Sequence, residues 1–345
     1  WLGAVIPPQG EKFDVAVANI GAPTDPVFSA GYTRPAATLA PGQSITIVSY
    51  RYAGAKDVDI LRSYQAPKEK GGLGIVGFDR AIDWGNFWML TRPIFATLDF
   101  LGDSIGNWGL AILVLTIVMR LLVFPFANGA FEMTAKMKKA QPQMEALKTQ
   151  YGNDPTKMQQ EMMALYKKEK INPVTGCLPI LLQIPIFYAL YKTLFVTIEL
   201  RHQPFFGFIR DLAAPDPTNL FNLFGLLPYD PTSIPLIGSV LHIGLLPLLY
   251  GVAMWFQMKL NPPAQDPIQQ QIFAIMPWMM VFLFAPFAAG LVIYWIWSTV
   301  ISIFQQFYFM KKHKVEIDWK ANFRPPWSKA KTPATAKPGP VAAGK

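Results

Sequence analysis

Long apolar segments alternate with polar ones along this chain, and one apolar segment carries a charge at its centre. Residues 110–126 are apolar except for Thr116 and Arg120, and their number is close to the ~20 residues that cross the hydrocarbon core of a bilayer. A central arginine costs at least ~2.5–3.5 kcal/mol on insertion scales, so it needs water, a partner or a task. Thr116 lies four residues earlier, on the same helical face. The pattern predicts an arginine that faces a polar cavity inside a helix bundle; the alternative is a soluble core helix whose arginine reaches solvent.

Four more apolar segments follow, at residues 174–198, 235–258, 270–285 and 287–310. Prolines interrupt several of them, which a membrane span tolerates when neighbouring helices satisfy the freed backbone groups. We therefore predict an α-helical polytopic membrane protein whose five-span bundle covers residues 107–310.

The polar segments differ in charge. Residues 127–172 carry eight lysines against five acidic residues, and the Pro-, Ala- and Lys-rich tail 311–345 carries nine basic residues against two acidic ones. Residues 199–235 have two arginines against four acidic residues. Because positively charged loops stay in the cytoplasm, we expect segment 127–172 and the tail inside, and loop 199–235 outside. The tail should be disordered, and its charge suits ribosomal RNA.

Segment 127–172 has the pattern of a helical hairpin. Its first half has a coiled-coil spacing of apolar residues, formed by Met133, Met137, Ala140, Met144, Leu147 and Tyr151. Residues 152–155 interrupt this pattern, and Asp154 can cap a second helix that starts at Pro155. Met158, Met162 and Leu165 continue the apolar seam on that helix. Such a methionine-rich seam is either plain packing or an adaptable docking surface for apolar partners.

Residues 1–77 have the features of the end of a β-sandwich domain followed by a linker at 65–77. The sequences KFDVAVANI and SITIVSYRYAG are rich in β-branched and aromatic residues. The chain starts at Trp1 without a charged-then-apolar leader, so we expect a fragment that has lost an upstream signal or anchor and most of this domain. Residues 78–106 are amphipathic and Trp-containing, which favours a helix in the membrane interface; the alternative is a helix packed on the β domain.

Composition narrows the possible chemistry. The chain has 345 residues, of which 52% are hydrophobic, and a mean hydropathy of +0.25, in keeping with a polytopic membrane protein. One cysteine and three scattered histidines give no disulfide framework and no metal-ligand spacing. There is no serine elbow, P-loop or Rossmann glycine pattern, and the spans contain no Asp or Glu for a proton relay. We expect no enzymatic activity, no cofactor and no metal.

The spans do contain a set of polar residues, namely Arg120, Thr116, Gln183, Tyr294, Ser298, Thr299 and Ser302. Ser298 and Ser302 follow Tyr294 at intervals of four, on one helical face. Serine and threonine in spans often bond only to their own helix. Their coincidence with a central arginine and a glutamine nevertheless predicts a shared polar cavity.

Three sequence runs carry a resemblance to a known family. They are KKEKINPVTGCLPILLQIPIFYALY, ELRHQPFFGFIRDLAAPDP and PFAAGLVIYWIWSTVISIFQQ. Together with the order of the segments, they closely resemble the YidC/Oxa/Alb family of membrane protein insertases, over nearly the whole chain. The Gram-negative branch of that family adds a first span and a large periplasmic β-sandwich domain, and this chain lacks that span and most of the domain.

The resemblance implies a five-helix core around a hydrophilic groove that is open to the cytoplasm and the lipid but closed on the outside. It places the groove arginine at Arg120, a polar neighbour at Gln183, and an aromatic substrate-contact pair at Tyr294 and Trp295, where Trp295 replaces an expected tyrosine. It further implies an insertase and chaperone of the bacterial inner membrane, acting alone or with the Sec translocon. Its implied partners are nascent membrane proteins, the ribosome, the signal recognition particle pathway and the lipid bilayer.

Other functions fit the residues less well. A channel or anion transporter could use Arg120 as a selectivity charge, but there is no second basic ring. An intramembrane enzyme needs an acid or a nucleophile pair, which the spans do not provide. An assembly scaffold without an aqueous groove would leave Arg120 inaccessible to water. We therefore expect an insertase whose groove, lined by Arg120, Thr116, Gln183, Tyr294, Trp295 and Ser298, lowers the cost of moving a polar tail through hydrocarbon.

Overall fold

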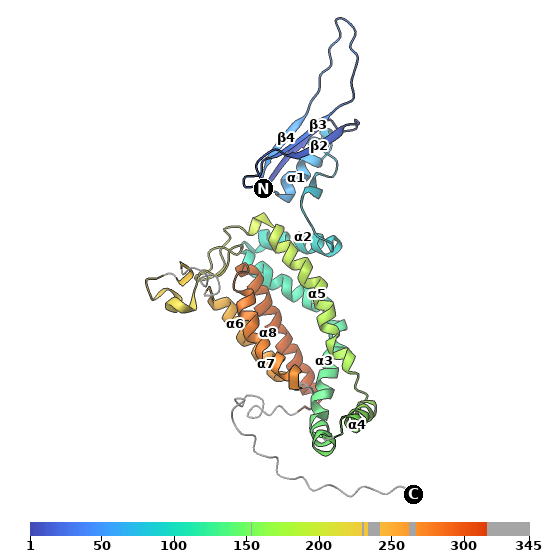
Figure 1. The fold of residues 1–345 in the computed structure, drawn as a ribbon, viewed down its shortest axis with the longest axis vertical. Helices are drawn as coiled ribbons and strands as arrows, with labels where there is room; N and C mark the ends of the chain where they lie inside the picture. The colour runs from blue at the N-terminus through green and yellow to red at the C-terminus, as the bar shows by residue number, and fades with distance from the viewer. Residues whose placement is uncertain (153, 230, 234–241, 262–266, 316–345) are drawn as a thin grey trace.

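The computed structural model describes residues 1–152, 154–229, 231–233, 242–261 and 267–315. It is elongated, with a β region at one end, a bundle of long helices in the middle and a helical hairpin at the other end (Figure 1). Most of the expected basic tail, from residue 316 onward, lies outside the described residues.

The β region consists of two separate two-stranded antiparallel sheets. One pairs β1 (Leu2–Ile6) with β4 (Tyr50–Gly54), and the other pairs β2 (Asp14–Asn19) with β3 (Phe28–Thr33). The strand predicted at 44–54 is therefore too long, since only its second half is paired. A helix, α1 (Val58–Gln65), follows where the sequence predicted the end of the domain, and the Asp57 side chain caps it by accepting from the Ile60 N–H at 2.9 Å.

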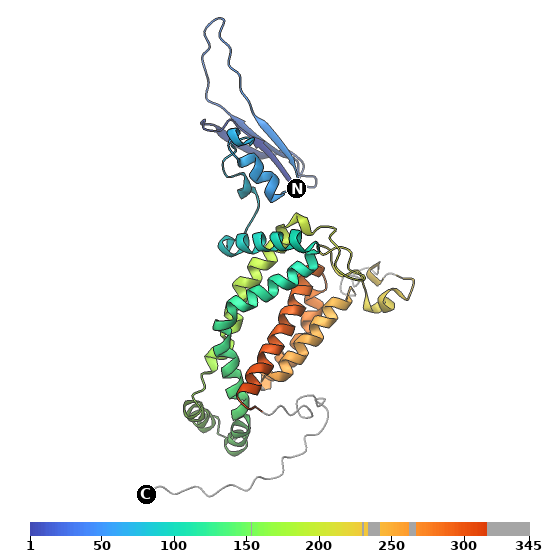
Figure 2. The same ribbon diagram turned by 180° about the vertical axis from the view of Figure 1, so that it is seen from behind.

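The predicted interfacial helix is shorter than its pattern suggested. A 3₁₀ turn, η2 (Phe78–Ala81), comes first, and helix α2 begins only at Trp88 and ends at Ile105. The intervening segment turns at Gly85 (φ 71°) and buries Trp84, whose ring meets that of Phe95 at 5.3 Å. Trp84 therefore belongs to the core beneath the β region. Helix α2 itself lies across the ends of the long helices (Figure 2), and its place in the membrane interface remains a prediction.

Five helices form the bundle: α3 (Trp108–Tyr151), α5 (Pro173–Val196), α6 (Leu245–Leu260), α7 (Pro267–Phe284) and α8 (Ala289–Lys312). By length and composition, two described stretches could cross a membrane, Trp108–Pro125 and Ala289–Lys312, while α6 and most of α7 form shorter apolar helices. The number of spans thus remains a prediction. Helix α6 starts later than the predicted 235, because Asp216 and Thr218 accept from the N–H groups of Leu246 (2.6 Å) and Leu245 (2.8 Å) and cap the helix there.

Helix α8 is the centre of the bundle and packs along both α3 and α6. Helix α7 packs on α6 at Gly251, where a Cβ atom would lie 2.4 Å from Cγ2 of Val281. This position needs glycine because the two helices approach so closely. Helix α5 touches α8 only sparsely, so the α5–α8 side is the least tightly packed face of the bundle.

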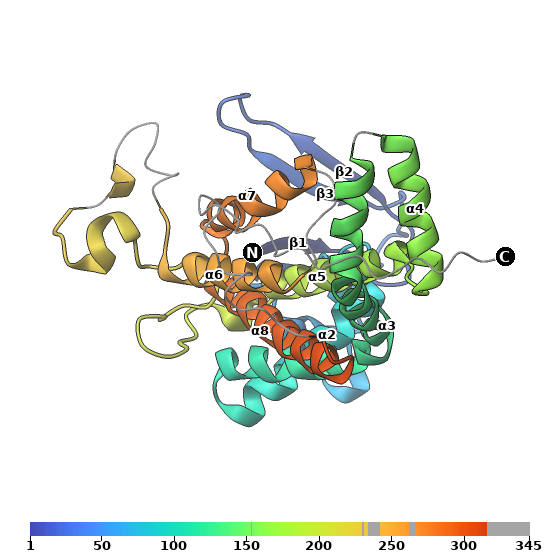
Figure 3. The ribbon, with the colours of Figure 1, turned by 90° about the horizontal axis from the view of Figure 1, so that it is seen from below.

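The predicted hairpin is confirmed as a pair of packed helices, α3 and α4 (Pro155–Lys168), which lies to one side of the bundle when viewed from below (Figure 3). Asp154 caps α4 by accepting from the N–H groups of Thr156 and Lys157, both at 3.1 Å. Met144 and Leu165 are buried in the seam, which Met133, Met137, Leu147 and Met162 flank. Helix α3 runs without a break from the bundle into this hairpin.

A buried lysine fixes α3 to α6 at the start of the hairpin. The Lys138 side chain is only 8% exposed overall, and its ammonium donates to the carbonyls of Lys259 (3.4 Å) and Leu260 (2.9 Å) at the end of α6. A cation at a helix C-terminus satisfies carbonyls that have no partner within the helix. Burial lowers the pKa of Lys138 to about 8. The first part of the hairpin is therefore anchored to the bundle.

Near the β region, Glu199 on η3 (Ile198–Leu200) should make stability depend on pH. Burial raises its pKa to about 7, with smaller contributions from the charges of Asp57, Asp99 and Asp59. A raised pKa in the folded state means that the folded chain binds a proton that the unfolded chain has released between about pH 4.5 and 7. Stability should therefore fall as pH rises through this range.

The check is the thermal stability of wild type and Glu199→Gln in detergent between pH 5 and 8. We expect the variant to lose this part of the pH dependence and to be the more stable protein at pH 8. Glu69→Gln, on an exposed turn, is the matched control and should behave like wild type. Parallel pH profiles for wild type and Glu199→Gln would contradict the prediction.

Candidate functional site

Arg120 of α3 reaches α8 and binds one residue there, Ser298. The Arg120 Nε donates to Ser298 Oγ at 3.1 Å, and Nη2 donates to the Ser298 carbonyl at 3.1 Å and also to Oγ. The same carbonyl accepts from the Ser302 hydroxyl at 3.0 Å. Among the described residues, no carboxylate forms an ion pair with Arg120. The guanidinium charge is thus hydrogen-bonded but not neutralised.

A second polar contact joins α5 to α8 beside the first. The Gln183 amide donates to the Tyr294 hydroxyl at 3.1 Å. Thr116 is buried, but its hydroxyl donates to the Ile112 carbonyl of its own helix at 2.6 Å. We call Arg120, Thr116, Gln183, Tyr294 and Ser298 the polar cluster. The structure therefore brings together five of the residues singled out from the sequence, although Thr116 bonds only within α3.

The space inside the polar cluster is small. A cavity of about 10 Å³ lies between Thr116, Arg120, Gln183 and Tyr294, with Met119, Val123 and Ile186 completing its lining. This volume is near the minimum that holds one water molecule. The described conformation is thus closed around Arg120, and a wide hydrophilic groove would require α5 to move away from α8.

Trp295 faces a different environment from the polar cluster. Its ring packs against Phe187 at 4.9 Å, Phe284 at 5.2 Å and Tyr250 at 5.7 Å, and its indole N–H is buried without a hydrogen-bond partner. A buried donor without an acceptor is costly. Trp295 thus belongs to the aromatic wall next to the cluster, and its N–H is available to a group that enters between α5 and α8.

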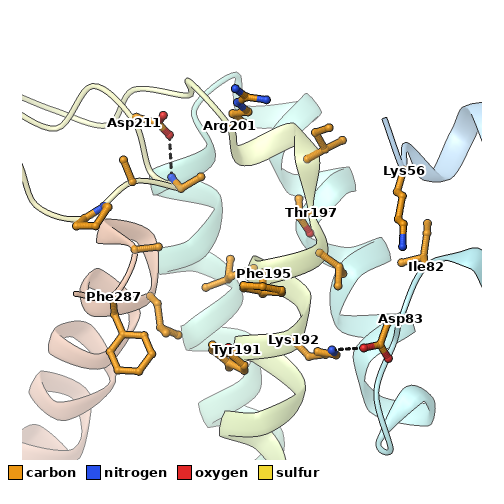
Figure 4. Close-up of a pocket in the computed structure, with 18 of the residues that line it drawn as sticks. Lys56, Ile82, Asp83, Tyr191, Lys192, Phe195, Thr197, Arg201, Asp211 and Phe287 are labelled. Atoms are coloured by element: carbon orange, nitrogen blue, oxygen red, sulfur yellow. Dashed lines mark hydrogen bonds and ion pairs between the residues drawn. The ribbon is translucent and has the colours of Figure 1, made fainter. Parts of the chain in front are cut away.

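The structure also contains a larger cavity that the sequence did not reveal. We call it the α5/α8 cavity: it measures about 920 Å³ and lies where α5 ends and α8 begins. Figure 4 shows Tyr191, Phe195 and Phe287 inside it, with Lys56, Lys192 and Arg201 around them. Only Lys192 gave a sequence signal, as a charge in an apolar segment, because the other two come from distant segments. Among the described residues no cluster of His, Cys, Asp or Glu could hold a metal ion.

Two family models match the chain and divide it near the start of the bundle. The model of the 60 kDa inner membrane protein matches residues 100–316, and the model of the YidC periplasmic domain matches residues 1–97. The boundary lies inside α2, so the polar cluster falls in the first family and the β region in the second.

Curated relatives agree with both matches. Proteins named membrane protein insertase YidC are 51% identical in Caulobacter vibrioides and 49% identical in Beijerinckia indica, with 92% of this chain covered in each case. The relative from Sinorhizobium fredii is 46% identical over 97% of the chain. The alignments cover 53%, 52% and 54% of these proteins, so the chain spans about half the length of the curated relatives it matches.

A solved structure has the same fold. It is described as an active YidC insertase crystal structure with the first transmembrane domain resolved, and it matches with a TM-score of 0.53 at 23% identity. The match covers 82% of this chain and 57% of that one. With the family model matching residues 100–316, the chain belongs to the family of the 60 kDa inner membrane proteins, which includes the membrane protein insertase YidC.

Proposed function

We propose that this chain is the catalytically inert core of a membrane protein insertase, in which the polar cluster receives a polar segment of a client protein. One observation carries the proposal: Arg120 keeps an uncompensated charge inside an apolar helix and holds it with neutral groups of Ser298. Such a charge is expensive unless it serves a function. Relatives named insertases, at 45–51% identity, support this choice.

The arrangement suggests how a tail could be received. The hydrogen bond between Gln183 and Tyr294 joins α5 to α8 across their sparse contact. If α5 moves aside, water enters, and Arg120 can exchange Ser298 for an acidic group of the client. A charge-assisted bond to a carboxylate is stronger than one to a hydroxyl. The client's apolar span would then pass between α5 and α8 into lipid, driven by apolar burial at roughly 25 cal/mol per Å².

The surrounding parts follow from this mechanism. The short apolar helices α6 and α7 would thin the bilayer and lower the barrier. The α3/α4 hairpin and the basic tail would face the cytoplasm and receive ribosome-bound chains, and the β region would lie outside. The Sec translocon and the signal recognition particle pathway are the proposed partners for larger clients.

Insertion of a small single-span client into liposomes that hold only the complete protein tests this function. We expect the client's polar tail to become inaccessible to added protease in an amount that rises with the quantity of protein reconstituted. Empty liposomes and liposomes with an unrelated polytopic protein are the controls. Ion conductance without insertion would instead support the channel or anion transporter that the sequence left as the alternative.

A further inference from the structure

The α5/α8 cavity combines an aromatic floor with a charged rim. Tyr191 and Phe195 stack at 5.8 Å on α5, and Tyr191 meets the ring of Phe287 edge-on at 6.3 Å. Phe195 is 71% exposed, so this floor is open to an entering group. The volume of about 920 Å³ is within the range of roughly 300–1,000 Å³ typical of ligand sites.

The charges on the rim do not cancel. Asp83 forms an ion pair with Lys192, whose hydrogen bond lowers the pKa of that carboxyl. Asp211 accepts from the backbone N–H groups of His202 (3.0 Å) and Ala213 (2.9 Å) and lies 3.2 Å from the His202 ring. Both carboxylates on the rim thus have partners of their own.

The remaining two cations, Lys56 and Arg201, have no ion pair within the described part of the chain. Lys56 precedes α1, and Arg201 follows η3, so they come from opposite sides of the cavity (Figure 4). Their positive charge is available to an anionic group above the aromatic floor.

A continuous line of side chains connects this cavity with Arg120. On α5, the residues Gln183, Phe187, Tyr191 and Phe195 follow one another at intervals of four and share one face. Gln183 bonds Tyr294, Phe187 packs on Trp295 at 4.9 Å and Tyr191 at 6.2 Å, and Tyr191 borders the cavity. The line follows the sparsely packed α5–α8 side.

We propose that the α5/α8 cavity is a second binding site for acidic peptide, which receives the client's tail after it has left Arg120. This inference rests on the proposed insertase function. Lys56 and Arg201 hold the tail's carboxylates, while the aromatic floor covers the neighbouring apolar residues. Two cations beyond the helix ends attract the acidic tail outward, so the tail moves from one positive site to the next.

An acidic peptide fits the cavity better than an anionic lipid does. Lys56 belongs to the β region, and Arg201 belongs to the loop after α5; both lie beyond the ends of the long helices. A translocated tail reaches this level, whereas a lipid headgroup lies at the level of the helix ends. The test therefore includes labelled lipid as a competing occupant.

The experiment places p-benzoylphenylalanine at position 195, in the cavity, or at position 186, which lines the polar cluster. The complete protein is reconstituted in vesicles that contain labelled phosphatidylglycerol, together with clients whose tails are acidic or carry the corresponding amides. The double variant Lys56→Gln, Arg201→Gln is compared with Arg51→Gln, Lys68→Gln, which removes two exposed charges of the β region that do not line the cavity.

We expect the acidic client to cross-link at both positions, and the cavity variant to lose the cross-link at 195 several-fold while keeping that at 186. The control variant should match wild type, and the amide client should cross-link weakly at 195. Equal cross-linking of both clients at 195, no effect of the cavity variant, or labelling of lipid alone would overturn this site. Cross-links at neither position would overturn the insertase function itself.

Discussion

Replacing Arg120 with alanine should remove most insertion of clients that have acidic tails, and Arg120→Lys should retain much of it. In a hydrated site, with an effective dielectric constant between about 20 and 80, two charges at 4 Å attract each other by about 1–4 kcal/mol. Because 1.4 kcal/mol corresponds to tenfold, the loss for alanine should be on the order of tenfold or more. Lysine keeps the charge but loses the planar fork. The measurement is insertion of a matched acidic and amide client pair, the second of which should suffer less.

The structure supplies the control that separates charge capture from a structural role. Arg120 links α3 to α8 only through Ser298 among its described hydrogen bonds, so Ser298→Ala removes the link and keeps the charge. If Arg120 acts by its charge, Ser298→Ala should insert the acidic client nearly as well as wild type. If Arg120 holds the bundle, Ser298→Ala and Arg120→Ala should lower the melting temperature together and harm both clients equally, which would refute charge capture.

The helices could be predicted well because hydrophobic spacing and caps act locally. The hairpin turn, with Asp154 before Pro155, and the apolar segments α5, α7 and α8 lie close to their predicted bounds. The β region could not be predicted to the same extent. Strands β1 and β3 contain glycine and alanine and have little β propensity of their own, so their pairing depends on distant partners.

The candidate site shows the same division between local and tertiary information. Arg120 and Gln183 stand out in apolar segments, and the sequence could place both in one cavity. Its closed state, with about 10 Å³ of space, depends on helix packing that no local pattern encodes. Lys138 is one of eight lysines in segment 127–172, and nothing in that segment distinguishes it, because its acceptors lie at the end of α6.

The anchoring of Lys138 changes how the hairpin should be tested. A deletion that includes Lys138 would remove both the hairpin and a contact that holds α3 to α6, so a loss of insertion would have two explanations. Replacing residues 144–165 by a short Gly-Ser linker removes the methionine seam of both helices and spares Lys138. The two ends of this segment are joined easily because α3 and α4 pack against each other.

This hairpin replacement should abolish insertion of ribosome-bound clients and leave the melting temperature of the bundle nearly unchanged, because the seam packs mainly on itself. Lys138→Ala should do the opposite: it leaves the Lys259 and Leu260 carbonyls without their charged donor, which costs about 1–3 kcal/mol, and insertion should fall only as far as the folded fraction does. Co-translational insertion and thermal unfolding, measured on both variants, separate the two effects. Full insertion by the linker variant would show that the hairpin is not a docking surface, and a destabilised bundle in that variant would show that the seam holds the fold.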